Sequence, residues 1–204
     1  LAAYMVEGRP SRDHMAARTL AASDPGAWDA LMSWCARVSA DFITSQIEAG
    51  ASAVQLFDSW VGSLSPRTYR ESVAPYSRMV AQRVAGAVSP VTGERAPLIH
   101  FGTGSAPILA DMAEVGPNCV GVDWKTDLSW AIAQVPGKAV QGNLDPALLQ
   151  APWPVIEQAV RDILDAGRSA PGHVFNLGHG VPPTTNPDVL TRIVELVHEL
   201  GDAR

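Results

Sequence analysis

A strand-like unit recurs along the chain, and this repetition limits the possible folds more than any other feature. Each unit is a short apolar run followed directly by Gly, Asp, Asn, Ser or His. Segments long enough for a crossover helix separate most of the runs, and strands that are apolar on both faces are typical of a parallel sheet covered by helices. The sequence therefore predicts an α/β protein. The predicted strands are residues 53–57, 97–101, 119–122, 139–141 and 173–176.

Helix signals lie between and around these strands. Ser65, Asp145 and Asn186 each precede a proline, which is the arrangement of a side-chain cap before the first helical position. Apolar residues at helical spacing predict amphipathic helices over residues 24–50, after Pro154 and after Asn186. Pro75 predicts a kink or break in the helix that begins near Pro66.

Two architectures fit such an alternation, an open doubly wound sheet and a barrel. The segment Gly102-Thr103-Gly104 has only the first two glycines of a dinucleotide-binding loop, since Pro107 stands where the third belongs, and this favours the barrel. Five units use nearly all 204 residues, whereas a (β/α)₈ barrel needs eight, and the chain begins with Leu1. We expect residues 1–204 to form a single domain, a TIM barrel truncated to about its last five β/α units.

Composition and charge exclude several functional classes. The formal net charge is -6, and Lys and Arg are not clustered, which argues against nucleic-acid binding. No apolar run reaches the roughly 20 residues of a membrane span, and no signal peptide is visible. Cys35 and Cys119 are far apart and outside any Cys-x-x-Cys motif, so we expect a cytoplasmic protein without disulfides. A small-molecule ligand fits best.

The candidate ligand-binding residues are the polar side chains that follow the strands, because ligands bind at the carboxyl ends of parallel strands. They are Asp58, Ser59, His100, Asp123, Asn143, Asp145, Asn176 and His179.

Each of these candidates also has a purely structural interpretation. His179 lies between two glycines that let a ligand approach, yet it could simply hold the last loop. Ser59 lacks a Gly-x-Ser-x-Gly elbow, so hydrogen bonding or capping suits it better than nucleophilic attack. Asp145 fits a helix cap, and His100 fits the core. A zinc site at His100 would need a His-x-Cys pattern and a second, distant Cys. It fails on ligand count, because residue 102 is Gly and no Cys follows Cys119.

The ordered strand ends, taken together, resemble bacterial uroporphyrinogen decarboxylases over essentially the whole chain. The segment from Tyr4 to Gly8 contributes to the resemblance at the start of the chain. The resembling segments are Leu56-Phe57-Asp58-Ser59-Trp60, Gly121-Val122-Asp123-Trp124, Gln141-Gly142-Asn143-Leu144-Asp145-Pro146 and Phe175-Asn176-Leu177-Gly178-His179-Gly180.

The resemblance implies a (β/α)₈ enzyme that converts uroporphyrinogen III to coproporphyrinogen III in haem and tetrapyrrole synthesis. Four acetate arms lose carbon dioxide, without cofactor or metal, and family members are cytoplasmic and commonly homodimers. In the family, an aspartate on an early strand stabilises the protonated pyrrole, and nearby arginines hold the substrate carboxylates. The resemblance places both in a segment that this chain lacks, so we expect the chain alone to be inactive.

The resemblance also assigns roles to four residues. It implies that Tyr4 and His179 are catalytic, and that Tyr4, Phe57, Ser59 and His179 bind the substrate uroporphyrinogen; the alternative for Phe57 is a core position. Two other functions stay open. One is a corrinoid-type methyltransferase of the same fold, which the missing thiolates disfavour, and the other is a non-catalytic tetrapyrrole-binding remnant.

Overall fold

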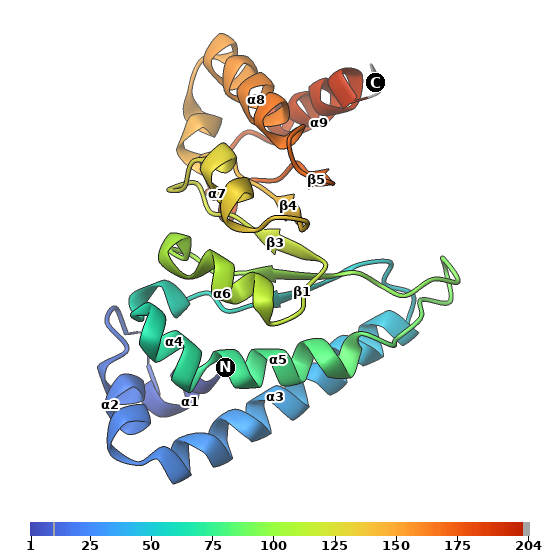
Figure 1. Cartoon of the computed structure of the whole chain (residues 1–204). Helices are drawn as coiled ribbons and strands as arrows, with labels where there is room; N and C mark the ends of the chain where they lie inside the picture. The colour runs from blue at the N-terminus through green and yellow to red at the C-terminus, as the bar shows by residue number, and fades with distance from the viewer. Residues whose placement is uncertain (10, 202–204) are drawn as a thin grey trace.

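A computed structural model describes residues 1–9 and 11–201, and its centre is a parallel sheet. The strands lie side by side in chain order, each parallel to the next. Figure 1 shows the sheet between the helices formed by residues 2–84 and the helix pair that ends the chain. The strands are β1 (Val54–Phe57), β2 (Leu98–Phe101), β3 (Cys119–Gly121), β4 (Ala139–Gln141) and β5 (His173–Val174).

Helices precede the first strand and follow every strand, as in the β/α units of a TIM barrel. The α-helices are α1 (Ala2–Glu7), α2 (Met15–Ser23), α3 (Pro25–Glu48), α4 (Pro66–Ser72), α5 (Ala74–Val84), α6 (Leu109–Glu114), α7 (Leu128–Gln134), α8 (Trp153–Gly167) and α9 (Pro187–Gly201). Short 3₁₀ helices are η1 (Val61–Ser63), η2 (Ala106–Ile108) and η3 (Pro146–Gln150).

The outer face of the sheet carries the core, because alternate strand residues point toward the helices. Val54 and Leu98 pack against α3 and α5, whereas Val120 and Val140 pack against α6 and α7. A further cluster between α8 and α9 includes Ile156, which is 1% exposed. The apolar strands therefore form a parallel sheet because helices cover this face.

The inner face of the sheet is concave. Gln141 on β4 donates a hydrogen bond of 3.0 Å to Gln55 on β1, although β2 and β3 lie between these strands. Three strand spacings of about 4.8 Å separate such strands in a flat sheet, so the sheet must curl for the two side chains to meet. Gly121 leaves room on this face for the Phe101 ring, which a Cβ at position 121 would approach to 2.8 Å. The curl is that of a partial barrel.

The sequence-based expectations for the elements are largely confirmed. All five strands are present, although β5 has only two residues. A break at Val73 separates α4 from α5, close to Pro75. Ser65 caps α4 by accepting a hydrogen bond from the Thr68 N–H. Asp145 also caps a helix, as expected, but the helix is the 3₁₀ helix η3.

A buried polar network ties β1, β2 and α5 together. His100 Nε2 donates to Asp58 Oδ2 at 2.8 Å, and Ser77 Oγ donates to the same oxygen at 2.7 Å. Burial raises the pKa of Asp58. The hydrogen bonds from His100 and Ser77, together with the electrostatic attraction of His100, outweigh burial and leave this pKa below its usual value. His100 is thus a satisfied core residue.

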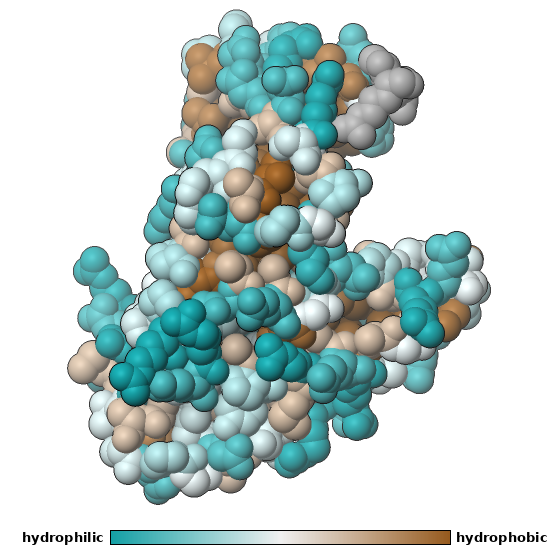
Figure 2. All heavy atoms as spheres, viewed as in Figure 1, coloured by the Kyte–Doolittle hydropathy of each residue, from teal (hydrophilic) through white to brown (hydrophobic). Residues whose placement is uncertain are grey.

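The surface is mixed in character. Figure 2 shows hydrophilic side chains over most of the visible face, with apolar ones gathered between the part formed by α7 to α9 and the part formed by α3 to α5. Within the residues described, no helix has both the length and the apolar character required to cross a bilayer.

Replacing Asp58 should show how strongly this network stabilises the fold. We predict that Asp58→Asn lowers the free energy of unfolding by about 2 to 3 kcal/mol at pH 7, because two donors lose their charged acceptor. The exposed ion pair of Asp41 with Arg83 provides the control, and Asp41→Asn should cost less than about 1 kcal/mol. Urea unfolding followed by circular dichroism measures both.

The free energies of unfolding of wild type and Asp58→Asn should also depend differently on pH. Because the folded-state pKa of Asp58 lies below its ordinary value of 3.8, its contribution is complete above that pH and is lost as pH falls through the folded-state pKa. The difference between wild type and Asp58→Asn should therefore narrow in acid. A difference in free energy of unfolding that stays constant from pH 7 to pH 3 would contradict a lowered pKa of Asp58 in the folded state.

Candidate functional site

The loops that follow the strands lie at one end of the sheet, because the strands are parallel. They carry the polar residues that the sequence singled out. The structure divides these residues into those that hold the loops together and those that face open space.

A cavity of about 390 Å³ opens beside the end of β1, within the usual size range of small-molecule sites. Its walls come from α1, α2, α3, α4 and α5 together with the end of β1 and the segment after it, and most of the lining residues are apolar. Four of the predicted site residues lie in this lining: Tyr4, Phe57, Asp58 and Ser59.

Tyr4 and Ser59 reach the cavity from segments that are far apart in sequence. The Tyr4 side chain projects from the short helix α1, and its ring meets Trp60 edge to face at 4.5 Å between centroids. Ser59 is held by its backbone, whose carbonyl accepts a hydrogen bond of 2.5 Å from the Thr103 hydroxyl. Tyr4 and Ser59 therefore both line the cavity next to Trp60.

Phe57 is the last residue of β1 and is 63% exposed. Its ring packs edge to face against Phe101 on β2, with centroids 6.2 Å apart. A large exposed aromatic side chain on a concave face is unusual for a core position and common where a ligand binds.

Asp123 and Asn143 join neighbouring loops. Asp123 accepts hydrogen bonds from the Gly104 N–H, the Lys125 N–H and the Thr126 hydroxyl. The Asn143 amide donates to the backbone carbonyls of Asp123 and Thr126. Because both side chains are buried and their contacts lie within the protein, they fix the loops after β2, β3 and β4.

Asp145 and Asn176 also make local contacts. Asp145 accepts from the Ala147 N–H, and Asn176 accepts from the Leu177 N–H. These contacts are those of cap and turn residues, and neither residue lines the 390 Å³ cavity.

His179 lies in the exposed loop after β5, at the opposite edge of the sheet from β1. Its ring meets Trp124 edge to face at 5.3 Å. The preceding Gly178 packs so closely on the loop after β3 that a Cβ there would lie 2.2 Å from the Trp124 nitrogen. The lining of the 390 Å³ cavity does not include His179, so the structure brings Tyr4, Phe57 and Ser59 together but leaves His179 apart.

Sequence reasoning missed His14 and Trp60, which also line this cavity. Trp60 was part of the resembling segment but was given no role, and His14 falls in a loop without a recognisable motif. The ring centroids of these two residues lie 4.7 Å apart. Only the packing of the segment before α2 against the loop after β1 reveals the pair.

The thiols and the acidic residues offer no metal centre. Burial raises the pKa of Cys35, which lines the cavity, and raises the pKa of Cys119 to about 11. Over residues 1–9 and 11–201, no three His, Cys, Asp or Glu side chains are close enough to hold a metal ion together.

Known proteins resemble the chain over almost its whole length. The profile of the family described as "Uroporphyrinogen decarboxylase (URO-D)" matches residues 1–200. Three proteins named uroporphyrinogen decarboxylase are similar to this chain in sequence. The identity is 54% for the protein of Arthrobacter sp. (strain FB24), 54% for that of Salinispora tropica and 53% for that of Streptomyces coelicolor. These alignments cover 97 to 98% of the chain but only 52 to 56% of the relatives. The chain thus spans about half the length of the curated relatives it matches.

A solved structure of a methyltransferase from Methanosarcina mazei shares the fold, with a TM-score of 0.76 and 18% sequence identity. It covers 91% of this chain, and the chain covers 53% of it. That likeness concerns the fold alone, whereas the sequence matches establish the family. With a profile match over residues 1–200 and identities above 50%, the chain belongs to the uroporphyrinogen decarboxylase (URO-D) family.

Proposed function

We propose that this chain forms part of a uroporphyrinogen decarboxylase, a carboxy-lyase that converts uroporphyrinogen III to coproporphyrinogen III. The observation that carries the proposal is the identity of more than 50% with decarboxylases along nearly the whole chain. The geometry supports it, because Tyr4, Phe57 and Ser59 line one cavity as the family roles require.

The chemistry demands an electron sink next to each acetate arm. Protonation of the adjoining pyrrole ring at carbon provides it. The bond between the arm's CH₂ and its carboxylate then breaks, carbon dioxide leaves, and the electron pair flows toward the cationic ring. The CH₂ carbon takes up a proton to become methyl as the ring gives up its extra proton, so each arm consumes one proton overall. A fixed negative charge near the ring lowers the barrier.

In our proposal the described residues bind and orient the substrate. The hydroxyls of Tyr4 and Ser59 donate hydrogen bonds to substrate carboxylates, and Phe57 contacts the face of the macrocycle. Asp58 and Asp123 are engaged by donors of the protein itself. The charge that stabilises the ring is therefore assigned to the part of the relatives that lies outside the match.

We also propose that His179 contacts the same substrate once the sheet is closed. The edges of β1 and β5 are the two ends of the sheet, and further strands between them would complete a (β/α)₈ ring. Ring closure brings the loop of His179 toward the loop of Ser59. The family resemblance further supports a cytoplasmic enzyme that acts as a homodimer, which sedimentation velocity of the full-length protein would test.

A second candidate function is a non-catalytic module that binds tetrapyrroles. Two observations favour it over a methyltransferase: the cavity holds the binding residues without His179, and the chain matches about half of each relative. The methyltransferase likeness, at 18% identity, supports the fold only.

Turnover distinguishes the two candidates. We predict that the 204-residue chain alone yields no coproporphyrinogen from uroporphyrinogen III. The chain mixed with the unmatched part of the Arthrobacter relative should yield products with seven to four carboxyl groups, separated by chromatography after oxidation. That unmatched part alone serves as the control. Porphyrin binding without turnover in the mixture would favour the non-catalytic module, and absence of both would refute the proposal.

Binding tests the cavity itself. We predict that Tyr4→Phe and Ser59→Ala each weaken uroporphyrin binding to the chain about five- to tenfold, because each removes one hydrogen bond to a carboxylate. Fluorescence titration of the porphyrin measures the affinity. Ser169→Ala removes an exposed hydroxyl that bonds the Ala166 carbonyl and should leave the affinity unchanged. Equal affinities for all four proteins would speak against this cavity.

His179 should act only in the closed protein. We predict that His179→Asn changes uroporphyrin binding to the chain alone less than about twofold, since His179 lies outside the cavity lining. In the mixture with the relative's unmatched part, the same substitution should lower turnover at least about tenfold. Unchanged turnover in that mixture would remove His179 from the site.

A further inference from the structure

We propose that His14 is a further ligand-binding residue, which holds one carboxylate of the tetrapyrrole at the wall of the cavity next to Tyr4. The inference rests on the proposed function and adds a residue to its site. It starts from an imidazole that the sequence did not single out.

The His14 side chain is buried but incompletely bonded. The residue is 7% exposed, and its Nδ1 has no hydrogen-bond partner among the described residues. A buried polar atom without a partner destabilises a protein, because it has lost its bonds to water, so each such atom needs an explanation such as a functional role. His14 lines the 390 Å³ cavity together with Tyr4 and Ser59.

The surrounding structure fixes the position of the imidazole. His14 has a left-handed backbone with φ of 47°, and its N–H donates to the Ser11 hydroxyl at 3.1 Å. Its ring packs against Trp60 at 4.7 Å, and Trp60 meets Tyr4 at 4.5 Å. The three rings therefore form one contiguous wall, which holds the imidazole and the phenol in a fixed relation.

A second, smaller cavity of about 90 Å³ shares part of this wall. Both cavities are lined by Ala3, Tyr4, His14 and Trp60, and the smaller one also by Glu7, Arg9 and Ser11. Its volume suits a carboxylate group but not a macrocycle. In our proposal a tetrapyrrole in the larger cavity extends one acidic arm alongside His14 into the adjoining smaller one.

The charges in the smaller cavity suit such an arm. Arg9 supplies a cation, and guanidinium groups bind carboxylates well. The opposing charge belongs to Glu7, whose Oε1 accepts a hydrogen bond of 3.1 Å from the Ala17 N–H at the start of α2. The donors in this lining that we assign to an incoming carboxylate are the Arg9 guanidinium, the Tyr4 hydroxyl and the His14 imidazole.

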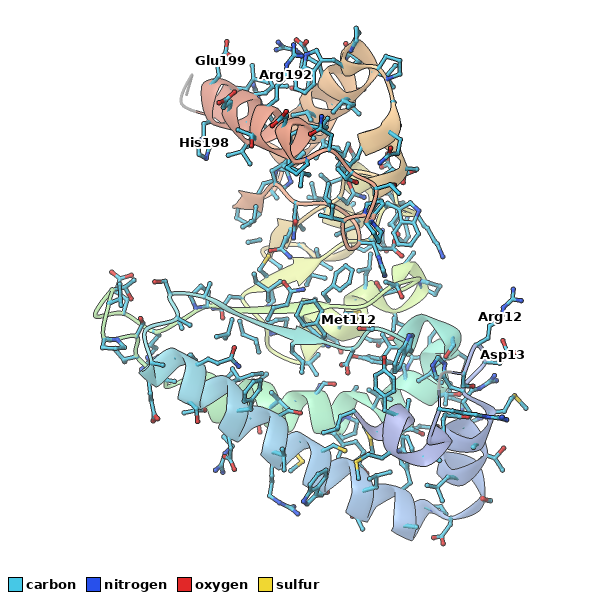
Figure 3. The ribbon with its side chains drawn as sticks, turned by 180° about the vertical axis from the view of Figure 1, so that it is seen from behind. Arg12, Asp13, Met112, Arg192, His198 and Glu199 are labelled. Carbon is cyan, nitrogen blue, oxygen red and sulfur yellow. The ribbon has the colours of Figure 1, made fainter. Side chains whose placement is uncertain are left out.

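Two substitutions separate hydrogen bonding from packing. His14→Phe keeps a ring against Trp60 but has no nitrogen, whereas His14→Asn keeps a hydrogen-bonding group and tolerates the left-handed backbone. We expect His14→Phe to weaken uroporphyrin binding about tenfold and His14→Asn less than about threefold. The control is Asp13→Asn, because Asp13 and Arg12 project away from the body of the molecule (Figure 3). Circular dichroism verifies that each variant is folded.

Arg9→Gln provides an independent test that does not disturb a buried position, because Arg9 is exposed. If both residues hold the same carboxylate, Arg9→Gln weakens binding about threefold or more, and its effect is smaller when His14→Phe is already present. Equal affinity of His14→Phe and wild type would overturn the inference, as would equal losses in His14→Phe and His14→Asn. If either result occurs while Tyr4→Phe and Ser59→Ala still weaken uroporphyrin binding, only the role of His14 is refuted and the proposed function stands.

Discussion

The curl of the parallel sheet determines where everything else in the molecule can lie. Helices cover the outer face and bury its Val and Leu side chains, while the inner face is drawn into a concave surface that Gln55 and Gln141 bridge. Without that curvature the loops at the strand ends would form a flat row. With it they form part of a rim on which side chains such as Asp123 and Asn143 join neighbouring loops. Curvature of this kind is what closes parallel strands into a barrel.

The polar residues on this rim fall into two groups with different physical roles. Asp58, Asp123 and Asn143 are buried or partly buried, and the hydrogen bonds of neighbouring strands and loops engage them. Tyr4 and Ser59 line the cavity, and the Tyr4 ring packs against Trp60. Residues of the first group give the rim its shape, and those of the second are available to a ligand. Tyr4 lies outside the strand-end pattern, and that pattern alone cannot separate Ser59 from the loop-fixing residues, because all of them follow a strand.

Much of the fold could be predicted from the sequence because its signals are local. Apolar runs located all five strands, proline and cap residues located several helix starts, and Pro75 located the break between α4 and α5. The short helices α1 and α2 could not be predicted, since neither has a long apolar stripe and their packing on Trp60 depends on contacts distant in sequence. The strand-end pattern and the family resemblance both indicate Ser59, and the resemblance alone supplies Tyr4, but no sequence signal marks His14. Its burial depends on the loop after β1, which lies more than 40 residues away.

Close backbone contact between loops has a mechanical consequence for the rim. Asp123 links the loop after β3 to the loop after β2, the Asn143 amide links it to the loop after β4, and Gly178 rests directly on the backbone of Trp124. Because these contacts form an unbroken series, a displacement of one loop is passed to its neighbours. The loop after β1 joins the same series, because the Ser59 carbonyl accepts a hydrogen bond from the Thr103 hydroxyl. The rim from β1 to β5 is therefore one braced arc, in which no loop shifts without its neighbours.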